Sequence, residues 1–177
     1  MVRRVLVPAL VLTLAAGLSA ASPASRFFKW PPWLSIESPV NPFDANTRGA
    51  VLLVHTMVRE GATSVGDLEG SAEGLIAGQR RSITLRFDPT SRQDVYALRR
   101  QWPDGSGPWV LRVTLLRNTT ALVGVDGTGM VSSVVVPTRL ERGVSLPRSV
   151  SSAEVDSMLT AAVATNRVAS SVASPKR

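Results

Sequence analysis

The chain has no cysteine and only one histidine, His55. The lack of a thiol excludes a disulfide framework, a Cys/His zinc set and a cysteine nucleophile. A Ser-His-Asp triad would have to use His55, which lies in the most apolar segment of the chain and not at a loop edge. Glycines occur singly in turns, so the sequence has neither a phosphate-binding loop nor a dinucleotide fingerprint. We therefore predict that the protein is not an enzyme and uses no metal or cofactor.

Long apolar runs are also scarce, and the sequence has only one, at its N-terminus. Two arginines precede the apolar residues 5–16 and small residues follow them, which is the three-part pattern of an export signal. The run is shorter than the roughly 20 residues of a membrane span. We expect residues 1–21 to be a signal peptide, cleaved after Ala21 or alternatively after Ala24. The mature chain is then periplasmic or extracellular, with no transmembrane span.

Lysine is nearly absent, although the formal net charge is +7. Only Lys29 and Lys176 are lysines among the twenty basic residues. The arginines are scattered, with no basic run longer than two, so we expect no nucleic-acid partner. The excess of positive charge indicates either an ordinary solvated surface or an anionic partner. We expect the partner to be another envelope protein or an anionic surface polymer.

Turn residues divide the rest of the chain into short segments. Residues 22–33 are rich in proline and aromatic residues and are expected to form an arm. Residues 34–137 are expected to form the domain, with strands at 34–38, 49–58, 67–75, 81–87, 95–102, 109–115, 121–125 and 131–136. Residues 138–165 are expected to be a loop followed by a helix, which a capping box at 151–154 begins. Residues 166–177 are expected to be a flexible tail.

This pattern predicts a mostly β fold. About seven or eight short strands with regular turn signals are typical of a single antiparallel, immunoglobulin-like β-sandwich, here with one C-terminal helix. The apolar alternation predicts a core of Val51, Leu53, Ile83, Leu85, Phe87, Tyr96, Leu98, Trp109, Leu111, Val113 and Val134.

Two aromatic strands carry a resemblance to a known family. The chain has Tyr96-Ala97-Leu98, then a glycine-containing turn, and then a Trp-x-Leu-x-Val strand that begins at Trp109. This resembles small exported immunoglobulin-like domains of the FixH/YtkA-like kind, over about a quarter of the mature chain. The resemblance implies a periplasmic or extracellular sandwich, in a group often linked to metal handling or envelope assembly. The sequence has no Met- and His-rich segment, so no ligand residue carries over.

We predict a candidate anion-binding face of three arginines on the outward side of the sheet. The turn between the two aromatic strands predicts that Trp102 pairs with Trp109. In that register Arg99 lies directly opposite Arg112, and Arg86 lies diagonal to Arg99. Like charges directly opposite are unfavourable, whereas the arginine fork binds a carboxylate or phosphate through two hydrogen bonds.

The alternative to an anion-binding face is a mixed-charge solvent surface. If Ile76 pairs with Gln79, Glu69 lies opposite Arg86 and neutralises it. Glu69 and Glu73 are both expected to face solvent on this interpretation.

His55 and Met57 form a second candidate pair, because residues two apart share one face of a strand. With Met130 nearby, this pair could hold Cu(I). The alternative is a hydrogen-bonded histidine beside a packing methionine, which is the ordinary arrangement in an apolar strand.

Together these observations predict an exported, non-enzymatic binding or accessory module of the bacterial cell envelope. The alternative is a structural component of envelope assembly, held by its aromatic arm and C-terminal helix.

Overall fold

The computed structural model describes residues 31–58 and 61–172, with side chains up to residue 166. The expected signal peptide and its cleavage sites lie outside the described residues, as do most of the arm and the end of the tail. Among the residues described here, no helix is long and apolar enough to cross a membrane.

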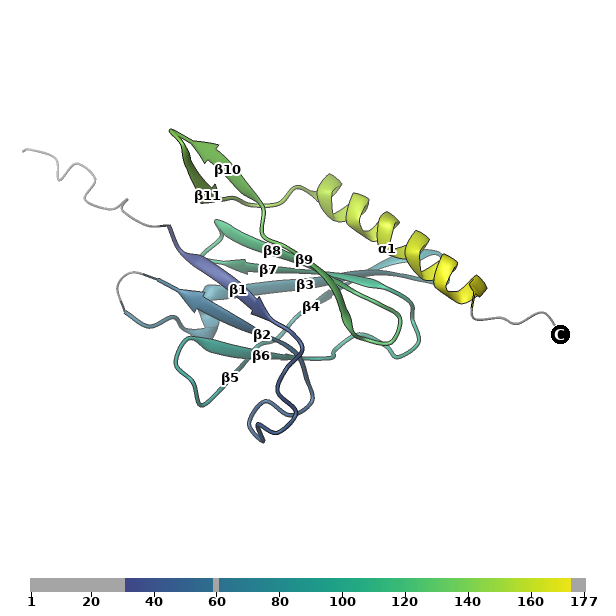
Figure 1. Ribbon diagram of the computed structural model, residues 1–177, viewed down its shortest axis with the longest axis horizontal. Helices are drawn as coiled ribbons and strands as arrows, with labels where there is room; N and C mark the ends of the chain where they lie inside the picture. Colours follow the sequence, from purple (N-terminus) through teal and green to yellow (C-terminus); the bar gives the residue numbers. More distant parts are fainter. Residues whose placement is uncertain (1–30, 59–60, 173–177) are drawn as a thin grey trace, which may run out of the picture.

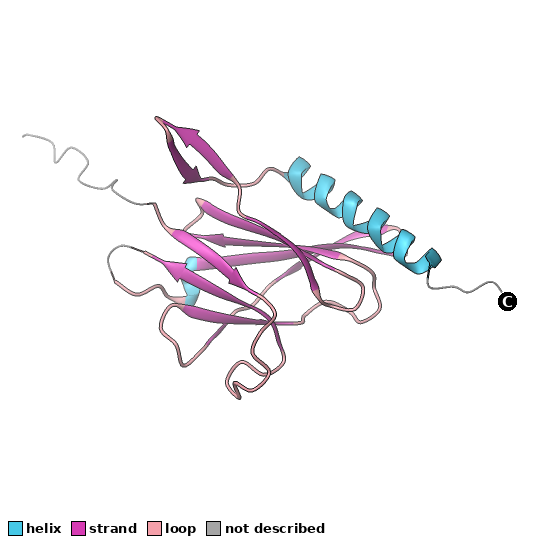
Figure 2. Cartoon of the chain, in the orientation of Figure 1, coloured by secondary structure: helices cyan, strands magenta, loops and turns pink. Residues whose placement is uncertain are grey.

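Two antiparallel sheets form the body of the molecule (Figure 1). The four-stranded sheet has the order β1 (Trp33–Glu37), β2 (Ala50–Met57), β6 (Val95–Arg99) and β5 (Asp88–Pro89). The five-stranded sheet has the order β4 (Gln79–Thr84), β3 (Leu68–Ile76), β7 (Trp109–Leu115), β8 (Thr119–Val125) and β9 (Val131–Val135). A short 3-10 helix, η1 (Val65–Asp67), precedes β3. The predicted class, mostly β with one C-terminal helix, is confirmed (Figure 2).

The main core lies between the two sheets, and β7 shows how the sequence builds it. Trp109, Leu111 and Val113 alternate with outward residues, and all three are completely buried. Gly74 of β3 lies opposite Trp109 in the ladder, where a Cβ would come within 2.5 Å of the indole ring. The missing side chain therefore makes the space that the tryptophan ring occupies.

Most of the predicted core is confirmed. Leu85, Phe87, Tyr96, Leu98, Trp109, Leu111 and Val113 are buried in the main core, with Val51 and Ile83 partly buried against it. Leu53 is buried in a separate cluster with Val95 and Ala97. The prediction for Val134 is wrong, because it lies on the edge strand β9 with 43% of its surface exposed.

The expected hairpin between β6 and β7 is also wrong, because these strands belong to different sheets. β6 pairs with β2, and β7 pairs with β3 and β8. The long Pro- and Gly-containing segment between them allows the chain to cross from one sheet to the other. Trp102 and Trp109 do meet, with ring centroids 6.4 Å apart, but as a packing contact in the core.

Residues expected to be a loop form a second hairpin, β10 (Thr138–Glu141) and β11 (Val144–Pro147). Its two-residue turn is Arg142-Gly143, and both residues have positive φ, at 50° and 81°. Two positive φ values are the requirement of the tight hairpin turn that matches strand twist. Arginine at the first position is an uncommon choice, so the sequence carried only a weak hairpin signal.

Helix α1 (Ser152–Val172) covers part of the outer face of the five-stranded sheet (Figure 1). The predicted capping box is confirmed: Glu154 N donates to Ser151 Oγ at 3.3 Å, and Ser151 N donates to Glu154 Oε2 at 2.9 Å. Val155 and Leu159 pack on Val110 and Leu122 of the sheet. The helix continues to Val172, so residues 166–172, which were predicted to belong to a flexible tail, are helical.

Candidate functional site

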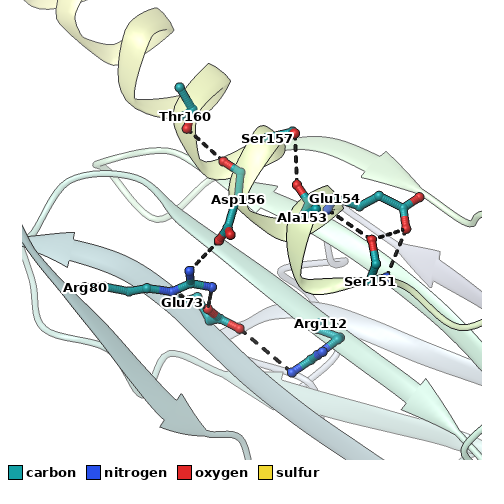
Figure 3. A network of polar contacts seen from close by, with 9 residues as sticks. All are labelled: Glu73, Arg80, Arg112, Ser151, Ala153, Glu154, Asp156, Ser157 and Thr160. Carbon is teal, nitrogen blue, oxygen red and sulfur yellow. Dashed lines mark hydrogen bonds and ion pairs between the residues drawn. The ribbon is translucent and has the colours of Figure 1, made fainter.

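The outer face of the five-stranded sheet is polar where α1 does not cover it. On β7, Arg112 and Thr114 point away from the core because they alternate with Leu111 and Val113. Glu73 of β3 shares this outward face. Figure 3 shows Glu73 and Arg112 beside Arg80 of β4, which reaches Asp156 of α1, in one polar network.

Glu73 is the buried acid of this network, with only 7% of its surface exposed. Arg80 of β4 donates to Glu73 Oε2 from Nε at 2.8 Å and also from Nη2. Arg80 Nη1 donates to Asp156 of α1, so one guanidinium joins the sheet to the helix. The hydrogen bonds to Glu73 raise the pKa of Arg80 above its ordinary value. A buried carboxylate needs such a partner, so this pair is structural.

Arg112 stands on the other side of Glu73 and is less firmly held. Its Nη2 lies 3.8 Å from Glu73 Oε1, which is too far for a good hydrogen bond. Its guanidinium makes no hydrogen bond to any residue in the described part of the chain, and 36% of the side chain is exposed. Arg112 therefore has donor groups available to a ligand.

A cavity of about 370 Å³ opens beside Arg112 on this face. It is lined by Glu69, Gly70, Ser71, Arg112, Thr114, Arg117, Thr120, Ser149 and Val150. Ser71 Oγ is shielded from solvent and has no hydrogen-bond partner among the described residues. Thr114 Oγ1 and Thr120 Oγ1 are 3.2 Å apart and bond to each other. The cavity thus contains a shielded hydroxyl and an arginine with available donors.

The residues just before α1 border the same cavity. Arg148 donates to Glu154 from Nη1 at 3.0 Å and also from Nη2. These bonds, together with those from Ser151, lower the pKa of Glu154 to about 2. The helix start is therefore fixed by a charged pair as well as by its capping box, and this holds Ser149 and Val150 at the cavity wall.

This arrangement is suited to binding an anion. A carboxylate or phosphate can accept two parallel hydrogen bonds from an arginine fork, and a third from a serine hydroxyl. Arg117 lies at the rim, 88% exposed, with its Nε 3.9 Å from Glu69 Oε1. Within residues 31–58 and 61–172 there is no cluster of three or more His, Asp or Glu side chains that could hold a metal.

The predicted arginine ladder is not formed, because its members lie on different elements. Arg99 is on the four-stranded sheet and forms an ion pair with Asp88. Arg86 lies between β4 and β5, where its backbone N–H donates to Gln101 Oε1 at 3.0 Å. Arg112 alone of the three lines the cavity. Ile76 does pair with Gln79, but the strand pairing ends at Thr84, before Arg86, and the ion pair of Glu69 is with Arg117.

Of the two arrangements considered for His55, the structure shows the ordinary one, a hydrogen-bonded histidine. His55 Nε2 lies 2.7 Å from Glu37 Oε2, and Arg92 Nη2 approaches the same carboxylate oxygen at 3.4 Å. Met57 is exposed on its strand, and Met130 lies at the start of β9 in the other sheet. The structure gives no support to a copper pair at His55 and Met57.

The sequence interpretation missed the acid at the centre of the network. Glu73 was expected to face solvent, but it is buried and bound by Arg80 across the hairpin, which in turn binds Asp156 on the helix. The hairpin register places Glu73 opposite Ser82, with Arg80 two positions away on the same face.

No protein-family model, no curated protein and no solved structure matches this chain. The resemblance to FixH/YtkA-like domains therefore stays a prediction.

Proposed function

We propose that the mature chain is an exported, non-enzymatic binding module of the bacterial envelope, and that it holds a carboxylate or phosphate group of an anionic surface polymer. The observation that carries this proposal is the cavity beside β7, where among the described residues Arg112 makes no hydrogen bond and Ser71 Oγ has no hydrogen-bond partner. The N-terminal export pattern supports the location.

Neighbouring charges explain why Arg112 is the residue available to a ligand. Glu73 is already bound by both Nε and Nη2 of Arg80, so its need for a cation is met without Arg112. A bound anion would take the donors that Arg112 does not use and would accept from Ser71 Oγ. Glu69 at the rim opposes an anion and competes for Arg117. We therefore expect weak binding that decreases with salt.

The binding proposal is tested by calorimetric titration of the purified chain with three oligomers of similar length. An oligouronate carries carboxylates, an oligo(glycerol phosphate) carries phosphates, and a neutral oligosaccharide carries neither. We expect one of the charged oligomers to bind and the neutral one not to bind. The matched variants are Arg112→Gln and Arg99→Gln, which remove the same charge from the two sheets.

Binding that is lost in Arg112→Gln and kept in Arg99→Gln supports the proposal. Equal losses in both variants would indicate attraction to net positive charge alone. Absence of binding to both charged oligomers would overturn the proposal.

The alternative, a structural component held through its C-terminal helix, has less support. The apolar side of α1 is already used inside the molecule, where Val155 and Leu159 are buried against the sheet. The outward positions of the helix, such as Ser157 and Thr160, are exposed and polar. Up to residue 166, where its side chains are described, the helix therefore has no second apolar face for an assembly.

A further inference from the structure

Exposed hydrophobic side chains are concentrated in one stretch of the chain. Of the nine large hydrophobic residues that are exposed in the described parts, five lie within residues 130–144. They are Met130, Val134, Val135, Leu140 and Val144. The stretch comprises the edge strand β9 and the hairpin β10–β11.

β9 is an unprotected edge. It is the last strand of the five-stranded sheet, and its sequence Val-Ser-Ser-Val-Val contains neither a charge nor a proline. The opposite edge, β4, carries Arg80 and Arg81, and the edge strand β5 has two residues and ends in Pro89. Charges, proline and short length are the usual protections against pairing with another strand. Of these protections, β9 has only a moderate length.

The β10–β11 hairpin stands away from the sandwich at the end of β9 (Figure 1). Its strands pair with each other and with no other strand of the described chain. Leu140 is 76% exposed and Val144 is 54% exposed. The hairpin therefore presents apolar side chains without using them in its own fold.

We propose that β9 pairs with β9 of a second copy of this chain, antiparallel about a two-fold axis, so that the two five-stranded sheets become continuous. Antiparallel pairing places the end of one β9 beside the start of the other. The hairpin that follows Val135 then lies next to Met130 of the second copy. One symmetric contact accounts for all five exposed residues.

The charge of the edge strands favours a second copy as the occupant. An uncharged edge meets its own copy with no like charges opposite, whereas β4 edges would bring arginines together. A five-residue strand alone buries less than the roughly 1,000 Å² of a stable interface, so the hairpin has to contribute. The Arg112 cavity is lined by residues of β3, β7 and β8 and of the segment before α1, and not by β9, β10 or β11, so the dimer does not depend on the proposed ligand.

Sedimentation equilibrium of the full purified chain tests this proposal. The wild type is expected to have twice the mass of one chain at micromolar concentrations. Val134→Lys and Leu140→Lys should each weaken the dimer by about tenfold or more, because a lysine would be buried or would face its own copy. Phe43→Lys is the control, since Phe43 is 91% exposed on the loop after β1. Thermal melts confirm that the variants remain folded.

A single-chain mass at all concentrations would overturn the proposal and would leave the edge to a different protein. An equal effect of Phe43→Lys would also overturn it, because the association would then be nonspecific. Loss of the dimer in both edge-region variants, with the control unchanged, supports it.

Discussion

The two faces of the five-stranded sheet use the same strands for different purposes. On the inner face of β7, Trp109, Leu111 and Val113 are fully buried in a continuous apolar core. On the outer face, Arg112 and Thr114 alternate with them and line a polar cavity. The comparison shows that a strand can secure the fold with one set of residues while the next residue along remains available for binding.

The largest effect should come from the inner face. Trp109→Ala is expected to lower the free energy of unfolding by about 3–5 kcal/mol, because a large buried ring is lost and leaves a cavity. Denaturant unfolding followed by circular dichroism measures it. Arg112→Gln is the outward control from the same strand and should change stability by less than about 0.5 kcal/mol. Similar losses for the two variants would mean that the faces do not differ as described.

The apolar part of the outer face should be less costly to disturb. Leu159→Ala removes a buried contact between α1 and the sheet and is expected to cost about 2–3 kcal/mol. The loss should be accompanied by faster hydrogen exchange in α1 than in β7, because the helix depends on this small cluster. Uniform acceleration in both elements would show that helix and sandwich unfold as one unit.

A substitution at Gly74 tests the inner face by adding an atom to the core instead of removing atoms from it. A Cβ at this position would meet the Trp109 ring at 2.5 Å, so Gly74→Ala should cost about 1–3 kcal/mol by overpacking. Gly66→Ala is the control, because its nearest contact would be at an ordinary 3.6 Å. Equal stability of the two variants would mean that the tryptophan ring moves aside freely.

The smallest effect concerns the charged pair at the start of α1 and depends on pH. The pKa of Glu154 is lowered from 4.5 to about 2, chiefly by Arg148, so its contribution to stability is complete above about pH 4.5. This contribution is lost as the pH falls from about 4.5 to 2. Melting curves of wild type and Glu154→Gln should therefore differ most above pH 4.5 and converge toward pH 2. A constant difference across this range would contradict the assignment.

Periodic segments of the sequence predicted the fold well where one face is apolar. β7 was predicted with its observed bounds from the alternation that begins at Trp109, and the capping box at Ser151 predicted the start of α1. Both signals are local, so they do not depend on where other elements lie. The Arg142-Gly143 turn was missed because its φ values, and not its residue types, define the hairpin.

Pairing between strands could not be predicted in the same way. β6 and β7 are consecutive apolar strands joined by a glycine-containing turn, and this pattern fits a hairpin as well as a crossing between sheets. Because the chain crosses between the sheets here, Arg99 and Arg112 lie on different sheets, and the predicted arginine ladder does not form. The network around Glu73 depends on α1 packing on β7 and β8, which brings Asp156 to Arg80 of the neighbouring hairpin. Contacts between residues so far apart in the chain produce no periodic pattern in the sequence.

The most direct test of the binding account is an amide NMR titration with whichever charged oligomer binds more tightly. We predict shifts confined to the cavity, at residues such as Ser71, Arg112 and Thr120, and no comparable shift around Arg99 on the other sheet. Shifts spread over the exposed arginines of both sheets, with none concentrated at the cavity, would contradict it.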